Sequence, residues 1–204
     1  MKNEQEVFWE GEFGSDYIDR NSDAKLLASN ISLFSKVLKS MQKIDSMIEF
    51  GSNIGMNIRS LNLLLPKLDI HAIEINKSAC DILKKNKNVT VHNESIIGFE
   101  TDRRFDLCLI KGVLIHTNPE SLKSVYKSIY DSSSRYICVA EYYNPTPMSI
   151  EYRGHKDKLF KRDFAGEMLD LYSDLKLVDY GFCYHRDPIH PKDDLTWFLL
   201  EKKN

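Results

Sequence analysis

Hydrophobic residues follow a helical period in the first part of the chain. Between residues 22 and 41, Leu26, Leu27, Phe34 and Leu38 fall on roughly one face of a helix. This stripe predicts an amphipathic helix that packs on a core through that face.

Farther along, short apolar runs alternate with segments of helical period. The run FDLCLIKGVLI opens with nearly continuous apolar residues, which is typical of a strand buried on both faces. Strands are predicted at 44–50, 69–75, 88–93, 105–115, 135–143, 175–185 and 195–202, and helices at 54–65, 77–86, 119–131 and 163–173. The polar stretch 144–162, rich in Pro, Arg and Gly, is predicted to be a connecting loop.

This order of elements predicts an α/β fold of the Rossmann-like, doubly wound kind. We expect a mostly parallel seven-stranded sheet with helices on both faces and an antiparallel C-terminal edge pair. The whole chain, 1–204, is expected to form one domain, with an N-terminal helical lid (1–42), a donor-binding core (44–140), and an acceptor loop followed by the last strands (141–204). Ligands of such sheets bind beyond the carboxyl ends of the strands, so the residues after each strand carry the functional argument.

Composition narrows the classes of function. The 204 residues are 42% hydrophobic and 28% charged, with a net charge of −2 and a pI near 6.3, so no strongly positive field favours nucleic acid or anionic lipid. No apolar run approaches the roughly 18 residues of a membrane span, and a cytoplasmic location is expected. The four cysteines are far apart and indicate neither a disulfide framework nor zinc, and no carboxylate cluster indicates another metal.

A glycine turn after the first predicted strand is the first candidate binding element. The sequence EFGSNIGMN places Glu49 two residues before Gly51, and Gly55 follows four residues later. Glycine lets the backbone turn sharply and lets a ligand approach closely, and free amides at the next helix start favour anions. Taken alone, the same pattern is also that of a plain tight turn.

An acid at the end of the second predicted strand strengthens this interpretation. Glu74 follows Gly55 by 19 residues, where a nucleoside-binding α/β protein needs a carboxylate for the ribose hydroxyls. The alternative is an exposed strand-end carboxylate. Glu49 would repel a pyrophosphate but suits a cation, so charge favours S-adenosylmethionine, which carries an ammonium and a sulfonium, over a nicotinamide cofactor.

With these residues the sequence resembles the class I methyltransferases, whose first motif is commonly E/D-x-G-x-G-x-G. Within that superfamily it is similar to the pseudaminic acid biosynthesis-associated methylases. The segments that carry this similarity are FWEGEFGSDYIDRN (8–21), EFGSNIGMN (49–57), VLIHTNPE (113–120), AEYYNPTP (140–147), YRGHKDKLFKRDFAGEML (152–169) and LVDYGFCYHRDP (177–188). Asn53 replaces the middle glycine of the motif and must accept the backbone geometry that glycine would supply.

The resemblance implies a donor site for S-adenosylmethionine, with S-adenosylhomocysteine as its product. In this site Glu74 holds the ribose, Glu94 contacts the adenine, and Ile75 and Ile96 pack against the purine face. Lys111 and its two successors lie beneath the methionine moiety. The donor-binding residues expected on this basis are Glu49, Gly51, Ser52, Asn53, Gly55, Glu74, Ile75, Glu94, Ser95, Lys111, Gly112 and Val113.

Candidate residues for the acceptor and the chemistry follow the later strands. His116 comes just after the fourth strand and is a candidate base, although it would equally cap the helix that begins near Pro119. The long connection 141–163 mixes aromatic, polar and cationic side chains, which favours an acceptor-binding loop over an idle, solvated one. Tyr143 and His155 are the other candidate catalytic residues; the substrate-binding candidates are Tyr17, Arg20, Asn144, Tyr152, Arg153, Lys161, Arg162 and His185.

An aromatic stripe near the N-terminus has two interpretations. Trp9, Phe13 and Tyr17 recur at a spacing of four, which is more typical of a helix packed on the core than of a binding surface. The position before the first strand also allows this segment to act as a lid over the donor.

The leading hypothesis is therefore a methyltransferase that uses S-adenosylmethionine and acts on a small polar acceptor. The family resemblance points to a sugar or nucleotide-sugar of the nonulosonic (pseudaminic) acid pathway, with oxygen or nitrogen as the methylated atom. The alternatives are methylation of RNA or protein, a non-catalytic nucleoside-binding module that docks a partner protein through 144–163, and lastly a nicotinamide oxidoreductase.

Overall fold

A computed structural model describes residues 2–11, 13–14, 23–86, 88–152 and 155–203. The helices are α1 (Glu4–Glu10), α3 (Ala24–Lys39), α4 (Met56–Leu64), α5 (Lys77–Leu83), α6 (Leu122–Ser132) and α7 (Phe164–Leu171), with 3-10 turns η2 (Leu114–His116) and η3 (Pro119–Ser121). The strands are β1 (Ser46–Phe50), β2 (Asp69–Ile73), β3 (Val89–His92), β4 (Phe105–Lys111), β5 (Ser133–Glu141), β6 (Met148–Tyr152), β7 (His155–Lys161), β8 (Leu175–Cys183) and β9 (Leu195–Lys202).

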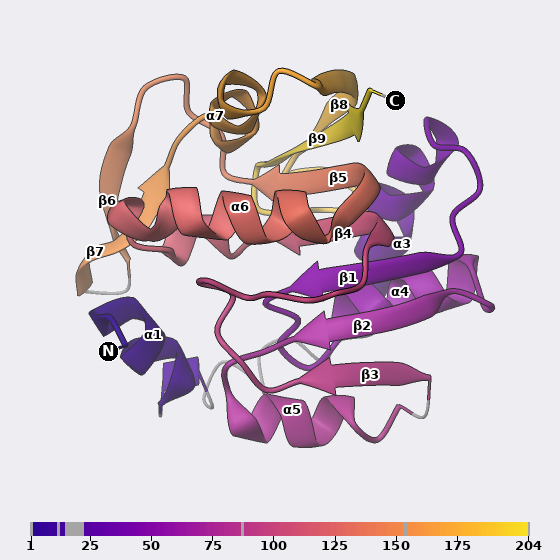
Figure 1. Ribbon diagram of the computed structural model, residues 1–204, viewed down its shortest axis with the longest axis horizontal. Helices are drawn as coiled ribbons and strands as arrows, with labels where there is room; N and C mark the ends of the chain where they lie inside the picture. The colour runs from indigo at the N-terminus through magenta and orange to yellow at the C-terminus, as the bar shows by residue number, and fades with distance from the viewer. Residues whose placement is uncertain (1, 12, 15–22, 87, 153–154, 204) are drawn as a thin grey trace.

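Seven strands form one sheet in the order β3-β2-β1-β4-β5-β9-β8 (Figure 1). The strands from β3 to β5 are parallel, whereas β9 runs antiparallel to both β5 and β8. The strand order reverses between β1 and β4, which makes the carboxyl ends of these strands the expected ligand site. The predicted Rossmann-like fold with its antiparallel edge pair is confirmed.

Two apolar clusters fill the space between the sheet and its helices. On one face, Leu33 and Phe34 of α3 and Ile58 of α4 pack against strand residues such as Met47 and Leu109. On the other face, Val125 and Ile129 of α6 and Met168 of α7 pack against the alternate strand positions, which include Ile48, Phe50, Cys108, Ile110, Ile137 and Val139. Burial of both faces explains why the parallel strands read as continuous apolar runs in the sequence.

Three local predictions need correction. The stretch 144–162 is not a plain loop, because β6 and β7 pair there as an antiparallel hairpin. The strand predicted at 105–115 ends at Lys111, since Gly112 turns the chain with a φ of 68° and η2 follows. The N-terminal aromatic stripe is not carried by one helix, because α1 ends at Glu10 and the next residue, Gly11, has an extended backbone.

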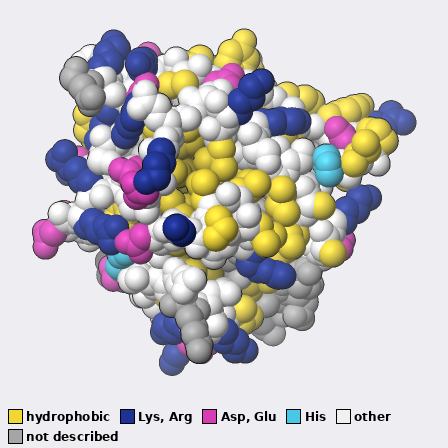
Figure 2. All heavy atoms as spheres, turned by 90° about the vertical axis from the view of Figure 1, so that its right-hand side faces the viewer, with side chains coloured by type: hydrophobic (Ala, Val, Ile, Leu, Met, Phe, Trp, Pro, Cys, Tyr) yellow, Lys and Arg dark blue, Asp and Glu magenta, His cyan; other side chains and the backbone are white. Residues whose placement is uncertain are grey.

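The surface carries both signs of charge. Figure 2 shows the side of the molecule at which the parallel strands have their N-terminal ends. Hydrophobic side chains gather near the middle of this side, and Lys and Arg are spread around them with Asp and Glu among them. In the described part of the chain, no helix has the length and apolar character needed to cross a bilayer.

Candidate functional site

The turn between β1 and α4 holds three left-handed positions at alternate residues. Gly51 has a φ of 76°, Asn53 of 47° and Gly55 of 80°. A Cβ on Gly51 would lie 2.6 Å from Cγ2 of Val113, so this glycine lets the ends of β1 and β4 approach each other. Asn53 adopts the geometry that the missing glycine would supply, as the sequence requires, and asparagine tolerates it better than most residues.

Glu74 ties this turn to the end of β2. Its Oε2 accepts a hydrogen bond from the Asn53 backbone N–H at 2.7 Å, and its Oε1 accepts one from the Asn76 N–H at 2.7 Å. Burial raises the pKa of Glu74, and these backbone hydrogen bonds oppose the rise. Each carboxylate oxygen has a further lone pair, so the fixed side chain can still accept hydroxyl groups from a ligand.

Glu49 is fully buried and stands behind the cavity rather than in its wall. Its Oε1 accepts a 2.6 Å hydrogen bond from Nδ2 of Asn57, and Asn57 does line the cavity. Burial raises the pKa of Glu49 to about 7, against the opposing effects of Asn57 and Lys111. This acid therefore acts on the cavity through Asn57.

The segment after β4 is held by a second buried acid. Glu141, at the end of β5, accepts hydrogen bonds from the N–H groups of Val113 (2.9 Å) and Leu114 (3.0 Å). Burial raises the pKa of Glu141 to about 7, although these N–H groups oppose the rise. The bonds fix the turn η2, which carries His116 at its end.

A cavity of about 320 Å³ opens at the carboxyl ends of β1, β2 and β4. Ligand pockets typically span roughly 300–1,000 Å³, so the volume is that of a small-molecule site. Of the residues predicted from the sequence, the cavity brings together Gly51, Ser52, Asn53, Glu74, Ile75, Ser95, Lys111, Gly112, Val113 and His116. Two predicted donor residues do not line the cavity. Gly55 is the residue before α4, and Glu94 is exposed on the surface.

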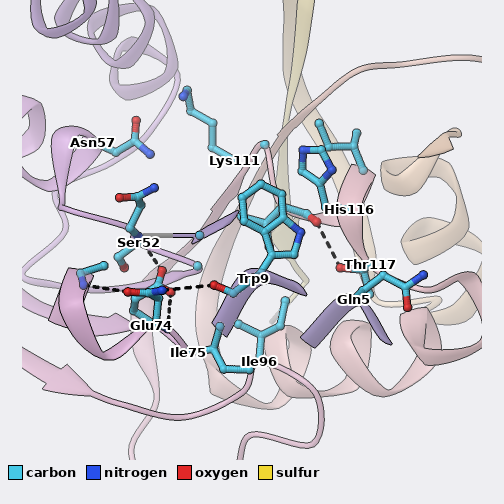
Figure 3. A pocket seen from close by; sticks show the side chains of 18 of the residues that line it. Gln5, Trp9, Ser52, Asn57, Glu74, Ile75, Ile96, Lys111, His116 and Thr117 are labelled. Carbon is cyan, nitrogen blue, oxygen red and sulfur yellow. Dashed lines mark hydrogen bonds between the residues drawn. The ribbon is translucent and has the colours of Figure 1, made fainter. Parts of the chain in front are cut away.

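Helix α1 covers one side of this cavity. Trp9 lies near its middle, beside His116, and the two ring centroids are 4.7 Å apart (Figure 3). Nδ2 of Asn76 donates to the Glu10 carbonyl at 3.1 Å, and Ser95 Oγ donates to Oε1 of Glu6 at 2.5 Å. The helix is thus bonded to the segments that follow β2 and β3.

The predicted acceptor residues are dispersed. Tyr143 is 41% exposed and packs on Phe198 outside the cavity, and Arg162 forms an ion pair with Glu167 at 2.7 Å. Lys161 lies over the ring of Tyr142, a cavity residue, with Nζ 5.2 Å from the centroid.

The other predicted acceptor residues do not line the cavity or lie outside the residues that the structure describes. Asn144 donates to the Thr146 carbonyl, and His185 pairs with Asp194 at 2.8 Å. Tyr17, Arg20 and Arg153 lie outside the described residues, and of Tyr152 and His155 only the backbone, in the hairpin, is described.

Several cavity residues escaped the sequence analysis as site residues. Those with polar or aromatic side chains include Asn3, Gln5, Glu6, Trp9, Asn30, Asn57, Asn76, Thr117, Asn118, Tyr142, Lys192 and Asp193. Asn76 had a local signal, because it caps α5 directly after the ribose-acid candidate. Asn30 and Lys192 gave no such signal, since the fold brings them together across 162 positions. Among the described residues, no group of three His, Cys, Asp or Glu side chains could hold a metal ion.

Comparison with solved structures identifies the class of fold. The chain is similar to 1,6-didemethyltoxoflavin-N1-methyltransferase from Burkholderia thailandensis, solved with S-adenosylhomocysteine, at 13% identity and a TM-score of 0.69, over 94% of this chain and 86% of that one. It is also similar to magnesium protoporphyrin IX methyltransferase from Synechocystis PCC 6803, solved with S-adenosylmethionine, at 9% identity and a TM-score of 0.69, over 99% of both chains. The N-methyltransferase NodS from Bradyrhizobium japonicum WM9 matches at 14% identity and a TM-score of 0.66, over 90% of this chain and 99% of that one.

These likenesses establish that the chain has the Rossmann-like fold of these methyltransferases. No protein-family model matches the sequence, and no curated protein matches it.

Proposed function

We propose that this protein is a methyltransferase that transfers the methyl group of S-adenosylmethionine to a small polar acceptor. The observation that carries the proposal is the shared cavity of Glu74, the left-handed glycine turn and His116. A nucleoside-binding carboxylate and a candidate base thus face the same small space.

In this proposal the donor would lie along the cavity from Glu74 toward Lys111. The ribose hydroxyls donate to Glu74, whose orientation the Asn53 and Asn76 amides fix. The adenine packs between Ile75 and Ile96, which both line the cavity. The methionine end then extends past Gly51 toward Lys111, away from the adenine.

Methyl transfer is an in-line displacement at the methyl carbon. A lone pair on the acceptor oxygen or nitrogen forms the new bond to carbon while the carbon–sulfur bond breaks, and its electron pair neutralises the sulfonium. The acceptor proton passes to His116, which stands at the end of η2 with an exposed fraction of only 8%. Trp9 beside it restricts the access of water.

The acceptor belongs, in this proposal, to the sugars or nucleotide-sugars of the nonulosonic acid type. The support is the similarity of the quoted segments to the pseudaminic acid-associated methylases, together with the chemistry beside His116. Thr117, Asn118 and Tyr142 line the cavity there and offer hydroxyl and amide groups to a polyol. Tyr143, His155 and the cationic residues of 141–163 remain candidates for the outer part of this site.

The test combines binding with turnover. Calorimetry should detect S-adenosylhomocysteine binding to the purified protein, and a donor with an isotope-labelled methyl group should label one member of a panel of free sugars and nucleotide-sugars, read by mass spectrometry. Binding without transfer to any sugar, nucleotide-sugar, RNA or peptide would favour the non-catalytic module. Binding of NADH with no uptake of S-adenosylhomocysteine would refute the proposal.

A further inference from the structure

Lys192 is a buried lysine on the wall of the cavity. It lies in the connection between β8 and β9, and only 7% of its surface is exposed. Its Nζ donates a hydrogen bond to Oδ1 of Asn30, a buried residue of α3. The amide is neutral, so this contact solvates the ammonium without balancing its charge.

A second ammonium faces the same end of the cavity. The side chain of Lys111 points away from Trp9 and toward Asn57 (Figure 3). Burial and, after it, the nearby charge of Lys111 together lower the pKa of Lys192 to about 7, against a smaller opposing effect of Asp193. The two lysines therefore repel each other in a poorly solvated space.

The carboxylates nearby do not pair with these lysines. Among the described residues, no carboxylate oxygen lies within 4.0 Å of either ammonium. Glu49, Glu141 and Asp193 still act on Lys111, because their charges oppose the lowering of its pKa by burial. Glu49 is bonded to Asn57 behind the wall, Glu141 accepts from the Val113 and Leu114 N–H groups, and Asp193 is an exposed residue on the cavity rim. Burying an ammonium that no carboxylate contacts costs several kcal/mol, so an anionic group that reaches both lysines would be stabilised at this end of the cavity.

We infer that Lys111 and Lys192 form a binding site for an oxyanion, a carboxylate or phosphate group, at the inner end of the cavity. Lysine binds such groups as a point charge, and Asn30 holds Lys192 in the direction from which it meets the ligand. On the proposed function, two sources can supply this anion: the amino-acid carboxylate of the donor, or an acidic group on the acceptor.

Two substitutions test the site by different routes. Lys192→Met keeps the length of the side chain and removes its charge, a change that is often tolerated where a buried charge gives way to an apolar group of similar volume. Asn30→Asp keeps Lys192 and gives it an internal carboxylate, which occupies the ammonium in place of the ligand. Lys67→Met, at an exposed position, is the matched control. Thermal melting of each variant establishes that it is folded.

Calorimetry with three probes separates the sources. The probes are S-adenosylhomocysteine, 5′-methylthioadenosine, which lacks the amino-acid carboxylate, and inorganic phosphate. If the donor supplies the anion, both site variants bind S-adenosylhomocysteine at least tenfold more weakly, and methylthioadenosine affinity stays within twofold. If the acceptor supplies it, S-adenosylhomocysteine affinity is unchanged, and phosphate binding, measured with that product bound, is lost in both variants and kept in Lys67→Met.

The inference is overturned if S-adenosylhomocysteine and phosphate bind to both variants as they bind to the unmodified protein. It is also overturned if the unmodified protein binds no phosphate and the variants keep full affinity for S-adenosylhomocysteine. The proposed function fails separately: a protein that binds no S-adenosylhomocysteine but loses phosphate binding in both variants keeps the oxyanion site without the donor.

Discussion

The indole of Trp9 lies against the imidazole of His116, with the ring planes inclined by 54° and the centroids 4.7 Å apart. The two residues are 107 positions apart in the sequence, so the contact joins helix α1 to the turn after β4. The candidate base His116 thus contacts the helix that covers the cavity, so a movement of α1 would change the surroundings of His116.

Replacing this imidazole should separate catalysis from donor binding. His116→Ala removes the proton acceptor, and general-base contributions are typically about 10²–10⁴-fold, so kcat should fall within that range. The affinity for S-adenosylhomocysteine should change less than about threefold, because other side chains make the proposed donor contacts. Single-turnover kinetics and calorimetry measure the two quantities.

Chemical rescue provides the control for that variant. Added imidazole should restore part of the lost rate, since it can occupy the space of the missing ring and take up the proton. An unchanged kcat in His116→Ala would show that His116 caps its turn and takes no part in proton transfer.

Glu74 should determine donor affinity. Glu74→Gln keeps the size of the side chain but removes the charge and one acceptor oxygen, and hydrogen bonds to a charged group contribute roughly 1.5–3 kcal/mol. The Kd for S-adenosylhomocysteine should therefore rise about ten- to a hundredfold, as measured by calorimetry below the melting transition. Glu100→Gln, at an exposed position, is the matched control. Equal affinity in the Glu74 and Glu100 variants would remove the ribose assignment.

Asn53 allows a direct test of backbone strain in the glycine turn. A left-handed backbone costs a non-glycine residue roughly 1–2 kcal/mol, and glycine avoids this cost. Asn53→Ala and Asn53→Gly both lose the hydrogen bond from the Ile54 N–H to Oδ1 of Asn53, so their difference reports the conformation alone. We expect Asn53→Gly to be the more stable by about 1 kcal/mol in denaturant unfolding. Equal unfolding free energies would contradict the left-handed conformation.

The sequence predicts those parts of the molecule whose structure is determined by residues close together along the chain. The seven strands follow from apolar runs, and the glycine turn and Glu74 follow from their order along the chain. The left-handed conformation of Asn53 can also be predicted from the sequence, because asparagine is one of the few residues that accept it in place of glycine. Each of these features is determined by neighbours within one strand–turn–helix unit.

Features that depend on distant contacts could not be predicted in this way. The hairpin β6–β7 lies outside the main sheet, and residues 148–151 of β6 are exposed or half-buried, so this strand shows no clear alternation of apolar and polar positions. Lys192 looks like one more surface lysine until α3 brings Asn30 to it. The spacing of Trp9, Phe13 and Tyr17 leaves both a core helix and a lid open, because the contact of Trp9 with His116 is set by tertiary packing.

The buried acid Glu141 should make stability depend on pH in a definite direction. Its pKa rises from an ordinary value of 4.5 to about 7 in the folded protein because burial disfavours the charged form. Between these two values the folded state holds a proton that the unfolded state has released, so the free energy of unfolding falls as pH rises from about 4.5 to about 7. Glu49 is shifted in the same direction and contributes to the same fall.

Glu141→Gln should reduce this slope, because the amide keeps an oxygen that can accept from the Val113 and Leu114 N–H groups but does not titrate. Unfolding free energies of both proteins at pH 5, 6, 7 and 8 give the difference due to Glu141, since the contributions of all other groups cancel. The variant should gain stability relative to the unmodified protein as pH rises through this range, by an amount on the order of 1–3 kcal/mol. Glu120→Gln, at an exposed position, should keep the original slope. Parallel curves for Glu141→Gln and the unmodified protein would mean that Glu141 is already ionised in the folded state at pH 5.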